Sequence, residues 1–442
     1  MTTNGYGVCI LRKPRFFIGF VLALLVSTST WFYMNRILRA QQLADAAAHD
    51  RPRGNLSDLY PRWLGARELL LHGRNPYSSD ITLEIQRGYY GRPIDLSRPY
   101  DPKDEQGFAY PAYVVFLLAP TVGVPFHTVQ IGFRWLLTGL AVMTVLCWLR
   151  VLRWKTSFGT ALIFIILMLG WLPVVQAIKL QQLSLLVAGL LSACGACLAS
   201  GWLFLAGGLL ALATIKPQLT WPLVLWLLVW AGADWRFRRR FVFGFALVML
   251  LLLGGAELVL PHWLGMFVQG ISRYHQYTQN QSVLTSLFGL IVGRLLGVAC
   301  VLACGFCIWR LRGEAASDAS FGRAFGLVLA LTVAIVPMSA LYNQILLAPA
   351  ILALVKSAWS RELILPAVQK ARVVGFILLV WPWITTLSLS LVSFWLTPEL
   401  RERVWPMPLY PSYVIPVFVF GLALLDTWGS EQRSLRDSAP AE

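Results

Sequence analysis

A single acid stands where the first apolar part of the chain gives way to a polar one. Asp58 opens the stretch DLYPRWLGARELLLHGRNPY, residues 58–77, beyond an apolar segment near residues 16–34. A carboxylate at the lip of a cavity could accept a proton from a sugar or lipid hydroxyl. Ser57 or Asp58 is equally suited to cap a helix, so the residues alone leave both roles of Asp58 open.

The stretch that begins at Asp58 predicts a short amphipathic helix. Pro61 suits a first helical turn, and Gly73 suits the position just after the last turn. One face of this helix carries Leu59, Trp63, Ala66 and Leu70. We expect the helix to lie along the outer membrane surface, with its apolar face in the lipid boundary.

The composition indicates what surrounds this helix. Of the 442 residues, 57% are hydrophobic and only 13% are charged, whereas a soluble domain averages about 25% charged residues. The sequence therefore predicts an all-α, polytopic membrane protein, with residues 1–442 forming one integral membrane domain. The net charge of +16 does not indicate nucleic-acid binding, because Lys and Arg lie in short clusters between apolar segments.

Twelve apolar segments are predicted to be spans. They lie near residues 16–34, 128–149, 157–177, 181–200, 201–216, 217–233, 241–260, 283–309, 323–340, 342–356, 373–396 and 410–428. Another segment, 109–126, is proline-broken and is expected to be re-entrant. With both termini in the cytoplasm, the short inner segments hold 19 Lys and Arg and the short outer loops hold five, as the positive-inside rule requires. Residues 35–108 are then the first outer loop, and residues 429–442 a short cytoplasmic tail.

Polar residues gather at the outer ends of the predicted spans. Three outer turns contribute Lys179, Gln181, Gln182, Lys216, Gln218, Tyr342, Asn343 and Gln344. His262 follows the outer end of a fourth span, and Arg294 lies near the middle of a fifth. A single Lys at a turn commonly reaches to the interface, whereas an ionisable group within a span marks a functional site. The one-sided distribution predicts a cavity that opens on the outer face.

These features resemble glycosyltransferase family 87, whose members are multi-span GT-C enzymes. The similar stretches are residues 58–77, 108–120 (FAYPAYVVFLLAP), 181–186 (QQLSLL), 207–225 (GGLLALATIKPQLTWPLVL) and 339–349 (SALYNQILLAP). The family uses polyprenyl-phosphate-linked sugars, typically mannose. The resemblance thus implies a mannosyltransferase-like enzyme of the bacterial inner membrane, with its active site facing the periplasm or exterior. The family often has a histidine near the last stretch, where this chain has Asn343 and Gln344.

The resemblance also implies roles for individual residues. An acid in the first outer loop is the expected catalytic base of a GT-C enzyme, and Asp58 occupies that place. The cations expected at the donor phosphate are Lys179, Lys216, Arg62 and Arg294. The residues expected at the substrates are Gln181, Gln182, Gln218, Tyr342, Asn343, Gln344 and His262. One base without an enzyme nucleophile implies inversion at the anomeric carbon, with a lipid or glycan hydroxyl as acceptor and neither metal nor cofactor.

Two alternatives remain open at this point. The base could be another acid of residues 78–107, which contain Asp80, Glu84, Asp95, Asp101, Asp104 and Glu105. The protein could also be a transporter or flippase of lipid-linked saccharides. A transporter commonly has internal repeats and polar groups at the membrane midplane, whereas this sequence shows a one-sided polar cluster and no repeat.

Overall fold

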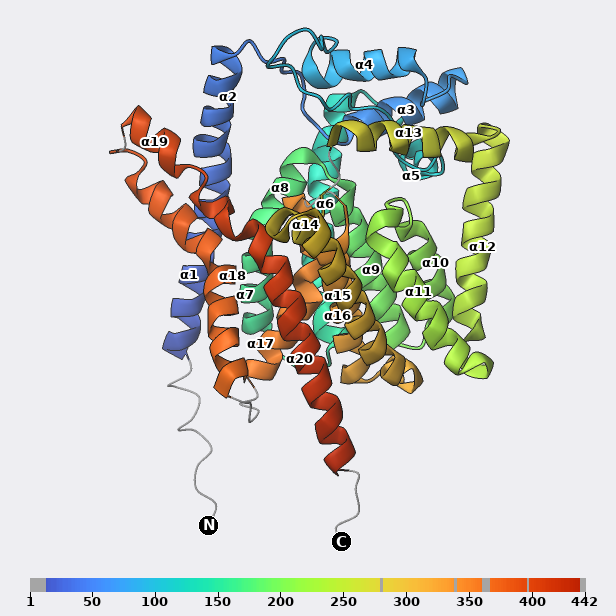
Figure 1. Cartoon of the computed structure of the whole chain (residues 1–442), viewed down its shortest axis with the longest axis vertical. Helices are drawn as coiled ribbons and strands as arrows, with labels where there is room; N and C mark the ends of the chain where they lie inside the picture. Colours follow the sequence, from blue (N-terminus) through green and yellow to red (C-terminus); the bar gives the residue numbers. More distant parts are fainter. Residues whose placement is uncertain (1–12, 279–280, 338–339, 360–365, 396, 438–442) are drawn as a thin grey trace.

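The protein is a bundle of helices with a helical cap at one end (Figure 1). The structure is a computed structural model that describes residues 13–278, 281–337, 340–359, 366–395 and 397–437. These residues form twenty α-helices joined by short 3-10, π and irregular segments, with no strand among them. The predicted all-α class is confirmed. Residues 1–12, and residues 438–442 of the predicted tail, lie outside the described residues.

The bundle contains long helices and shorter ones. The long ones are α1 (Lys13–Phe32), α6 (Phe126–Val151), α12 (Trp235–Val259), α15 (Leu290–Arg310), α18 (Pro366–Val392) and α20 (Val414–Asp437). The shorter ones are α2 (Leu38–Ala48), α7 (Phe158–Leu169), α8 (Leu172–Leu180), α9 (Leu183–Ala199), α10 (Leu203–Ala213), α11 (Pro217–Ala233), α14 (Val283–Phe288), α16 (Ala319–Ile335), α17 (Ala348–Trp359) and α19 (Pro398–Val404).

The helices support a membrane protein but not the predicted number of spans. Seven described segments are long and apolar enough to cross a membrane, or eight if α7 and α8, bent by 59° at their junction, form one broken span. Four further apolar helices, α9, α10, α11 and α16, are shorter than 18 residues, whereas a span needs about 20. The count of twelve therefore stays a prediction.

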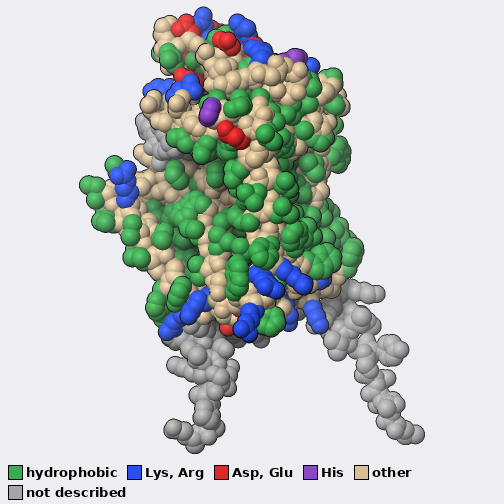
Figure 2. Space-filling view, turned by 90° about the vertical axis from the view of Figure 1, so that its right-hand side faces the viewer, with side chains coloured by type: hydrophobic (Ala, Val, Ile, Leu, Met, Phe, Trp, Pro, Cys, Tyr) green, Lys and Arg blue, Asp and Glu red, His purple; other side chains and the backbone are tan. Residues whose placement is uncertain are grey.

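The surface has an apolar belt between two charged ends (Figure 2). Lys and Arg gather at both ends, whereas the described acids visible in this view lie mainly at the end that carries the cap. The described parts of α1 and α20 that adjoin the chain termini lie at the end opposite the cap (Figure 1). This arrangement fits a protein that sits in a membrane with the cap on one side.

The cap is built mainly from the predicted first outer loop. It contains α3 (Tyr60–His72), α4 (Ser79–Tyr90) and the five-residue α5 (Val114–Leu118), joined by α13 (Trp263–Thr278) from later in the chain (Figure 1). The segment 109–126 forms α5 and a single 3-10 turn, so it is too short to cross a membrane. The sequence analysis did not predict α13.

Helix α3 confirms the predicted positions of Pro61 and Gly73, but neither its predicted N-cap nor its predicted surroundings. Pro61 lies in the first turn, and Gly73 ends the helix with a φ of 66°. Leu59, not Ser57 or Asp58, occupies the N-cap position, without a side-chain cap. The lipid-facing prediction was wrong, because Trp63 is buried within the protein and donates from Nε1 to the Thr121 carbonyl at 3.1 Å. The segment after Tyr110 folds back over this face of α3 and takes the place expected for lipid.

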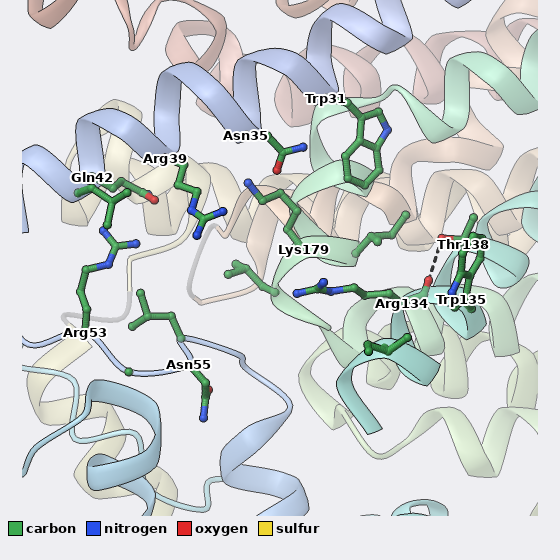
Figure 3. A pocket seen from close by; sticks show the side chains of 16 residues that line it. Trp31, Asn35, Arg39, Gln42, Arg53, Asn55, Arg134, Trp135, Thr138 and Lys179 are labelled. Atoms are coloured by element: carbon green, nitrogen blue, oxygen red, sulfur yellow. Dashed lines mark hydrogen bonds between the residues drawn. The ribbon is translucent and has the colours of Figure 1, made fainter. Parts of the chain in front are cut away.

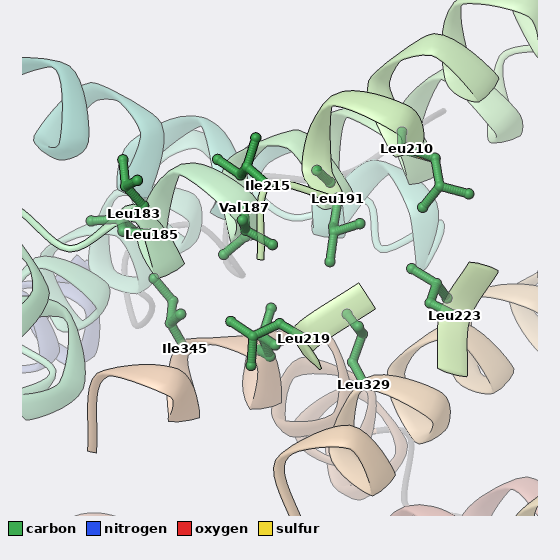
Figure 4. Close-up of a cluster of buried hydrophobic side chains, with 14 of the residues drawn as sticks. Leu183, Leu185, Val187, Leu191, Leu210, Ile215, Leu219, Leu223, Leu329 and Ile345 are labelled. Carbon is green, nitrogen blue, oxygen red and sulfur yellow. The ribbon is translucent and has the colours of Figure 1, made fainter. Parts of the chain in front are cut away.

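Beneath the cap, the shorter helices meet in an apolar core (Figure 4). Leu191 from α9, Leu210 from α10, Leu223 from α11 and Leu329 from α16 are all buried there. This core fixes the ends of α9 and α11, and both helices begin next to the polar residues described below. Burial inside the protein thus accounts for only one face of these short helices, because Phe204 on α10 and Trp221 and Leu225 on α11 are exposed.

Two glycines bring α10 and α12 into close contact. A Cβ placed on Gly207 would lie 2.1 Å from the Phe241 carbonyl oxygen, and one placed on Gly244 would lie 2.1 Å from the Phe204 carbonyl oxygen. A backbone carbonyl cannot move aside for an added Cβ as the end of a flexible side chain can. Small residues at such positions allow membrane helices to approach closely.

Substituting Gly207→Ala is expected to destabilise the folded protein by about 1–3 kcal/mol, because the added methyl group must push α10 away from α12. The measurement is the thermal unfolding midpoint of the purified protein in detergent. Gly254→Ala, also in α12, is the matched control, since a Cβ there meets no atom within 4 Å. Equal midpoints for the two variants would contradict this account of the helix pair.

Candidate active site

The segment before α3 is fixed to the turn between α8 and α9. The Asp58 backbone N–H donates to the Leu180 carbonyl at 2.9 Å. Ser57 Oγ donates to Gln181 Oε1 at 2.6 Å, and Gln130 Nε2 donates to the same oxygen at 3.0 Å. Gln181, fully buried and left-handed with a φ of 51°, makes the turn that carries these bonds. The Gln181 side chain therefore joins Ser57, before α3, to Gln130 on α6. It does not itself bond to the Asp58 carboxylate.

The Asp58 carboxylate turns away from α3 and accepts two hydrogen bonds from other elements. Tyr89 Oη, on α4, donates to Oδ1 at 3.0 Å, and Gln182 Nε2 donates to Oδ2. Burial, together with the charge of Asp58, holds the pKa of Tyr89 well above its ordinary value, so the phenol stays protonated as a donor. Each carboxylate oxygen can accept a further hydrogen bond, which leaves Asp58 able to receive another proton donor.

Gln182 connects Asp58 to a buried lysine. Lys216 Nζ donates to Gln182 Oε1 at 3.0 Å and to Ser184 Oγ at 2.7 Å, and Ser184 Oγ donates to Asn343 Oδ1 at 2.8 Å. Lys216 is only 6% exposed. Since Lys216 donates to Oε1, the Gln182 amide must present Nε2 to Asp58. We refer to the Asp58 network, which consists of Asp58, Tyr89, Gln182, Lys216, Ser184 and Asn343.

Two helix N-termini add positive character to the Asp58 network, and two aromatic rings stabilise its lysine. Gln182 is the N-cap residue of α9, and Lys216 is the N-cap residue of α11. The N-terminal end of a helix carries a partial positive charge, so two such ends meet at the Asp58 network. Lys216 Nζ also lies 5.8 Å from the ring centroid of Tyr110 and 5.2 Å from that of Tyr342. Electron-rich ring faces lower the energy of an otherwise poorly solvated cation.

Arg62 stands next to Asp58 on the first turn of α3. Its Nη1 donates to the Asp58 carbonyl at 2.9 Å, and its guanidinium lies over the Tyr110 ring at 4.4 Å. The buried Nε of Arg62 has no hydrogen-bond partner among the described residues. A buried N–H without a partner is costly, so this donor is suited to an anionic ligand. Asp104, half-buried nearby, has a pKa raised by burial.

Six of the predicted site residues come together. Asp58, Gln182, Lys216 and Asn343 belong to the Asp58 network, and Arg62 and Tyr342 lie beside it. The sequence analysis missed Tyr89, Tyr110 and Ser184. Tyr110 and Ser184 lie in the stretches FAYPAY and QQLSLL, which had been singled out. Tyr89, in the sequence GYYG, had no comparable signal.

The structure places the other predicted residues elsewhere. Lys179 donates to the Met34 carbonyl at 2.6 Å and lines a different cavity (Figure 3). Gln344 Nε2 donates to the Ser412 carbonyl at 2.5 Å. Gln218, His262 and Arg294 are exposed, and no hydrogen bond or ion pair joins them to the Asp58 network in the part of the chain that is described.

The described residues include no group of three or more His, Cys, Asp or Glu side chains that could hold a metal ion. Two acids of residues 78–107, Asp101 in the loop after α4 and Glu84 on α4, are instead paired with arginines. Arg92 pairs with Asp101 at 2.7 Å, and Arg74 pairs with Glu84 at 2.6 Å. Among the acids of residues 78–107, Asp104 is thus the strongest rival to Asp58.

The apolar helices and the polar site beneath the cap are those of an integral membrane protein with a half-buried acid linked to a buried lysine. Residues 108–337, just over half of the 442 residues, match glycosyltransferase family 87. The chain belongs to glycosyltransferase family 87 and is a membrane glycosyltransferase. No curated protein and no solved structure matches the chain. The matched residues include Tyr110, Gln182, Ser184 and Lys216, whereas Asp58 precedes them.

Proposed function

We propose that this glycosyltransferase moves a sugar, mannose as the first candidate, from a polyprenyl-phosphate donor to a hydroxyl of a lipid or glycan acceptor. The observation that carries the proposal is the Asp58 network, in which one carboxylate lies within two hydrogen bonds of a buried lysine. A carboxylate is suited to take a proton, and a lysine is suited to stabilise the charge that a departing phosphate gains. The two come from different parts of the chain, the turn before α3 and the N-terminal end of α11, and Gln182 links them.

The reaction needs one base and no covalent intermediate. The acceptor hydroxyl gives its proton to Asp58 while its oxygen attacks the anomeric carbon. The bond from that carbon to the phosphate oxygen breaks on the opposite side, and polyprenyl phosphate leaves with the bonding electrons. Direct displacement of this kind inverts the configuration at the anomeric carbon, so a β-linked donor gives an α-linked product.

Two cations are placed to act on the leaving phosphate. Lys216 is buried and donates to two neutral groups, and Arg62 has an Nε without a partner among the described residues. Charge that develops on a phosphate oxygen is stabilised more in the transition state than in the ground state, which raises the rate. Lys179 and Arg294 lie outside this group, so the donor-phosphate role is proposed for Lys216 and Arg62.

The test is sugar transfer by the full chain reconstituted into vesicles. The donor is radiolabelled polyprenyl-phosphate-mannose, with radiolabelled GDP-mannose as the comparison and an extract of membrane lipids and glycans as acceptor. Label should enter a product from the lipid-phosphate donor alone. Transfer from the nucleotide sugar, or from neither donor, would contradict the proposal, and labelled polyprenyl-phosphate-glucose tests the choice of sugar separately.

We also propose that the cap faces the periplasm or exterior and that both termini are cytoplasmic. In a Cys9→Ser background, Leu96→Cys, which replaces a side chain that is 75% exposed in the cap, is expected to react with an impermeant thiol reagent added to intact cells. Ala315→Cys, between α15 and α16, is the matched variant and should react only after the cells are opened. The reverse pattern would invert the orientation.

A further inference from the structure

A second polar site lies on the other side of the segment that carries Asp58. A cavity of about 870 Å³ is enclosed by α2, α6, α8 and residues 53–56 (Figure 3). Four of its lining residues are cations, namely Arg39 on α2, Arg53, Arg134 on α6 and Lys179 on α8. None of its lining residues is acidic. The four positive charges therefore come from four different parts of the chain and share one space.

These cations are not neutralised within the protein. Among the described residues, no hydrogen bond or ion pair engages the guanidinium groups of Arg39, Arg53 or Arg134. Lys179 has a neutral partner, the Met34 carbonyl. In Figure 3, Arg39, Arg134 and Lys179 extend toward the same space between α2, α6 and α8. Like charges that line one cavity repel one another, so an anion would stabilise the site.

The apolar side chains that line the cavity indicate what kind of anion it would bind. Trp135 is 74% exposed, and Leu43 and Ile131, which also line the cavity, are exposed as well. These side chains belong to the segments Phe16–Ala48 and Phe126–Val151, both of which are long and apolar enough to cross a membrane. A ligand with an anionic head and an apolar tail would match both parts. Tryptophan is itself enriched where apolar chains meet headgroups.

We propose that this cavity binds the phosphate headgroup of a membrane lipid, at a site separate from the Asp58 network. Two backbone segments, residues 54–58 and 178–182, lie between the cavity and the Asp58 network. They are joined by the hydrogen bond from the Asp58 N–H to the Leu180 carbonyl. Arginines hold phosphate oxygens through paired N–H donors. The lipid is either a polyprenyl phosphate or an anionic phospholipid, since both present the same chemistry. The inference does not depend on the proposed reaction.

The test is lipid binding by the full chain in detergent, measured by native mass spectrometry. The probes are a polyprenyl phosphate and phosphatidylglycerol, with the phosphate-free polyprenol and diacylglycerol as their counterparts. We expect the protein to retain at least one of the phosphate lipids and neither counterpart. The preferred phosphate lipid identifies the source. Equal retention of the phosphate-free lipids would overturn the proposal.

The double variant Arg134→Gln/Lys179→Met is expected to weaken binding of the phosphate lipid by about 10-fold or more, because two charge-assisted contacts are lost. Arg53→Gln, in a loop, gives a smaller loss and answers the objection that the double variant is misfolded. The matched control is Arg36→Gln, an exposed cation that does not line the cavity. Undiminished binding by both cavity variants would overturn the proposal.

Discussion

Asp58→Asn is expected to lower the rate of sugar transfer by about 10²- to 10⁴-fold, the range that a positioned general base contributes. Asparagine has nearly the same shape as aspartate and can still accept the Tyr89 hydroxyl, but its amide cannot take a proton from the acceptor. The measurement is transfer of label from the lipid-phosphate donor in vesicles. Asp58→Glu keeps the charge but moves it by one methylene, so its rate should fall between those of wild type and Asp58→Asn.

Two matched variants decide what a loss would mean. Asp80→Asn removes an exposed acid from the first turn of α4, and it should transfer at nearly the wild-type rate. Asp104→Asn tests the strongest rival, because Asp104 lies half-buried in the same cap. A full rate for Asp58→Asn, or a larger loss for Asp104→Asn, would show that Asp58 is not the base. Equal unfolding midpoints for wild type and variants would exclude misfolding as the cause.

The sequence predicted the class of fold well because apolar composition leaves few other choices. Its count of twelve spans stays a prediction, since α9, α10, α11 and α16 are shorter than 18 residues and hydropathy does not separate burial from lipid contact. Their buried faces meet one another, as Leu191, Leu210, Leu223 and Leu329 show. The bend between α7 and α8 does have a sequence signal, since Gly170 ends α7 and Pro173 lies in the first turn of α8, but the sequence analysis treated residues 157–177 as one span.

The role of the residue before α3 shows the limit of local rules. Ser57 and Asp58 are both good N-cap types, yet neither caps α3. Their side chains are used at longer range, by Gln181 and by Gln182 and Tyr89. A local pattern cannot foresee this, because the partners lie 31 to 124 positions away along the chain.

The residues predicted for one site lie in two different places for a related reason. Lys179 and Gln182 are three residues apart, so a turn rich in polar residues predicted one site. The left-handed turn at Gln181 sends them to opposite sides, Lys179 to the basic cavity and Gln182 to Asp58. Side-chain direction at a tight turn depends on one or two backbone angles, and spacing alone does not give them.

Lys216→Met is expected to lower the rate of transfer by about 10²- to 10³-fold, the usual loss when one fixed donor to a developing charge is removed. Methionine keeps the apolar length of the side chain, so the variant removes the charge and the bonds to Gln182 and Ser184. The measurement is the same transfer assay, with kcat and KM determined separately. A fall in kcat is expected, because the phosphate gains its charge during the reaction. Lys155→Met, an exposed lysine in the turn between α6 and α7, is the matched control and should transfer normally.

A double-variant cycle separates the two effects that Lys216 has in this geometry. Gln182→Met should reduce transfer less than Lys216→Met does, because it removes the donor to Asp58 but leaves the positive charge. Since Lys216 also sets the direction of the Gln182 amide, Lys216→Met/Gln182→Met should be little worse than Lys216→Met alone; residues in contact commonly show such non-additivity. Fully additive losses would mean that Lys216 acts on the phosphate independently of Gln182. Wild-type transfer by Lys216→Met would remove Lys216 from the proposed mechanism.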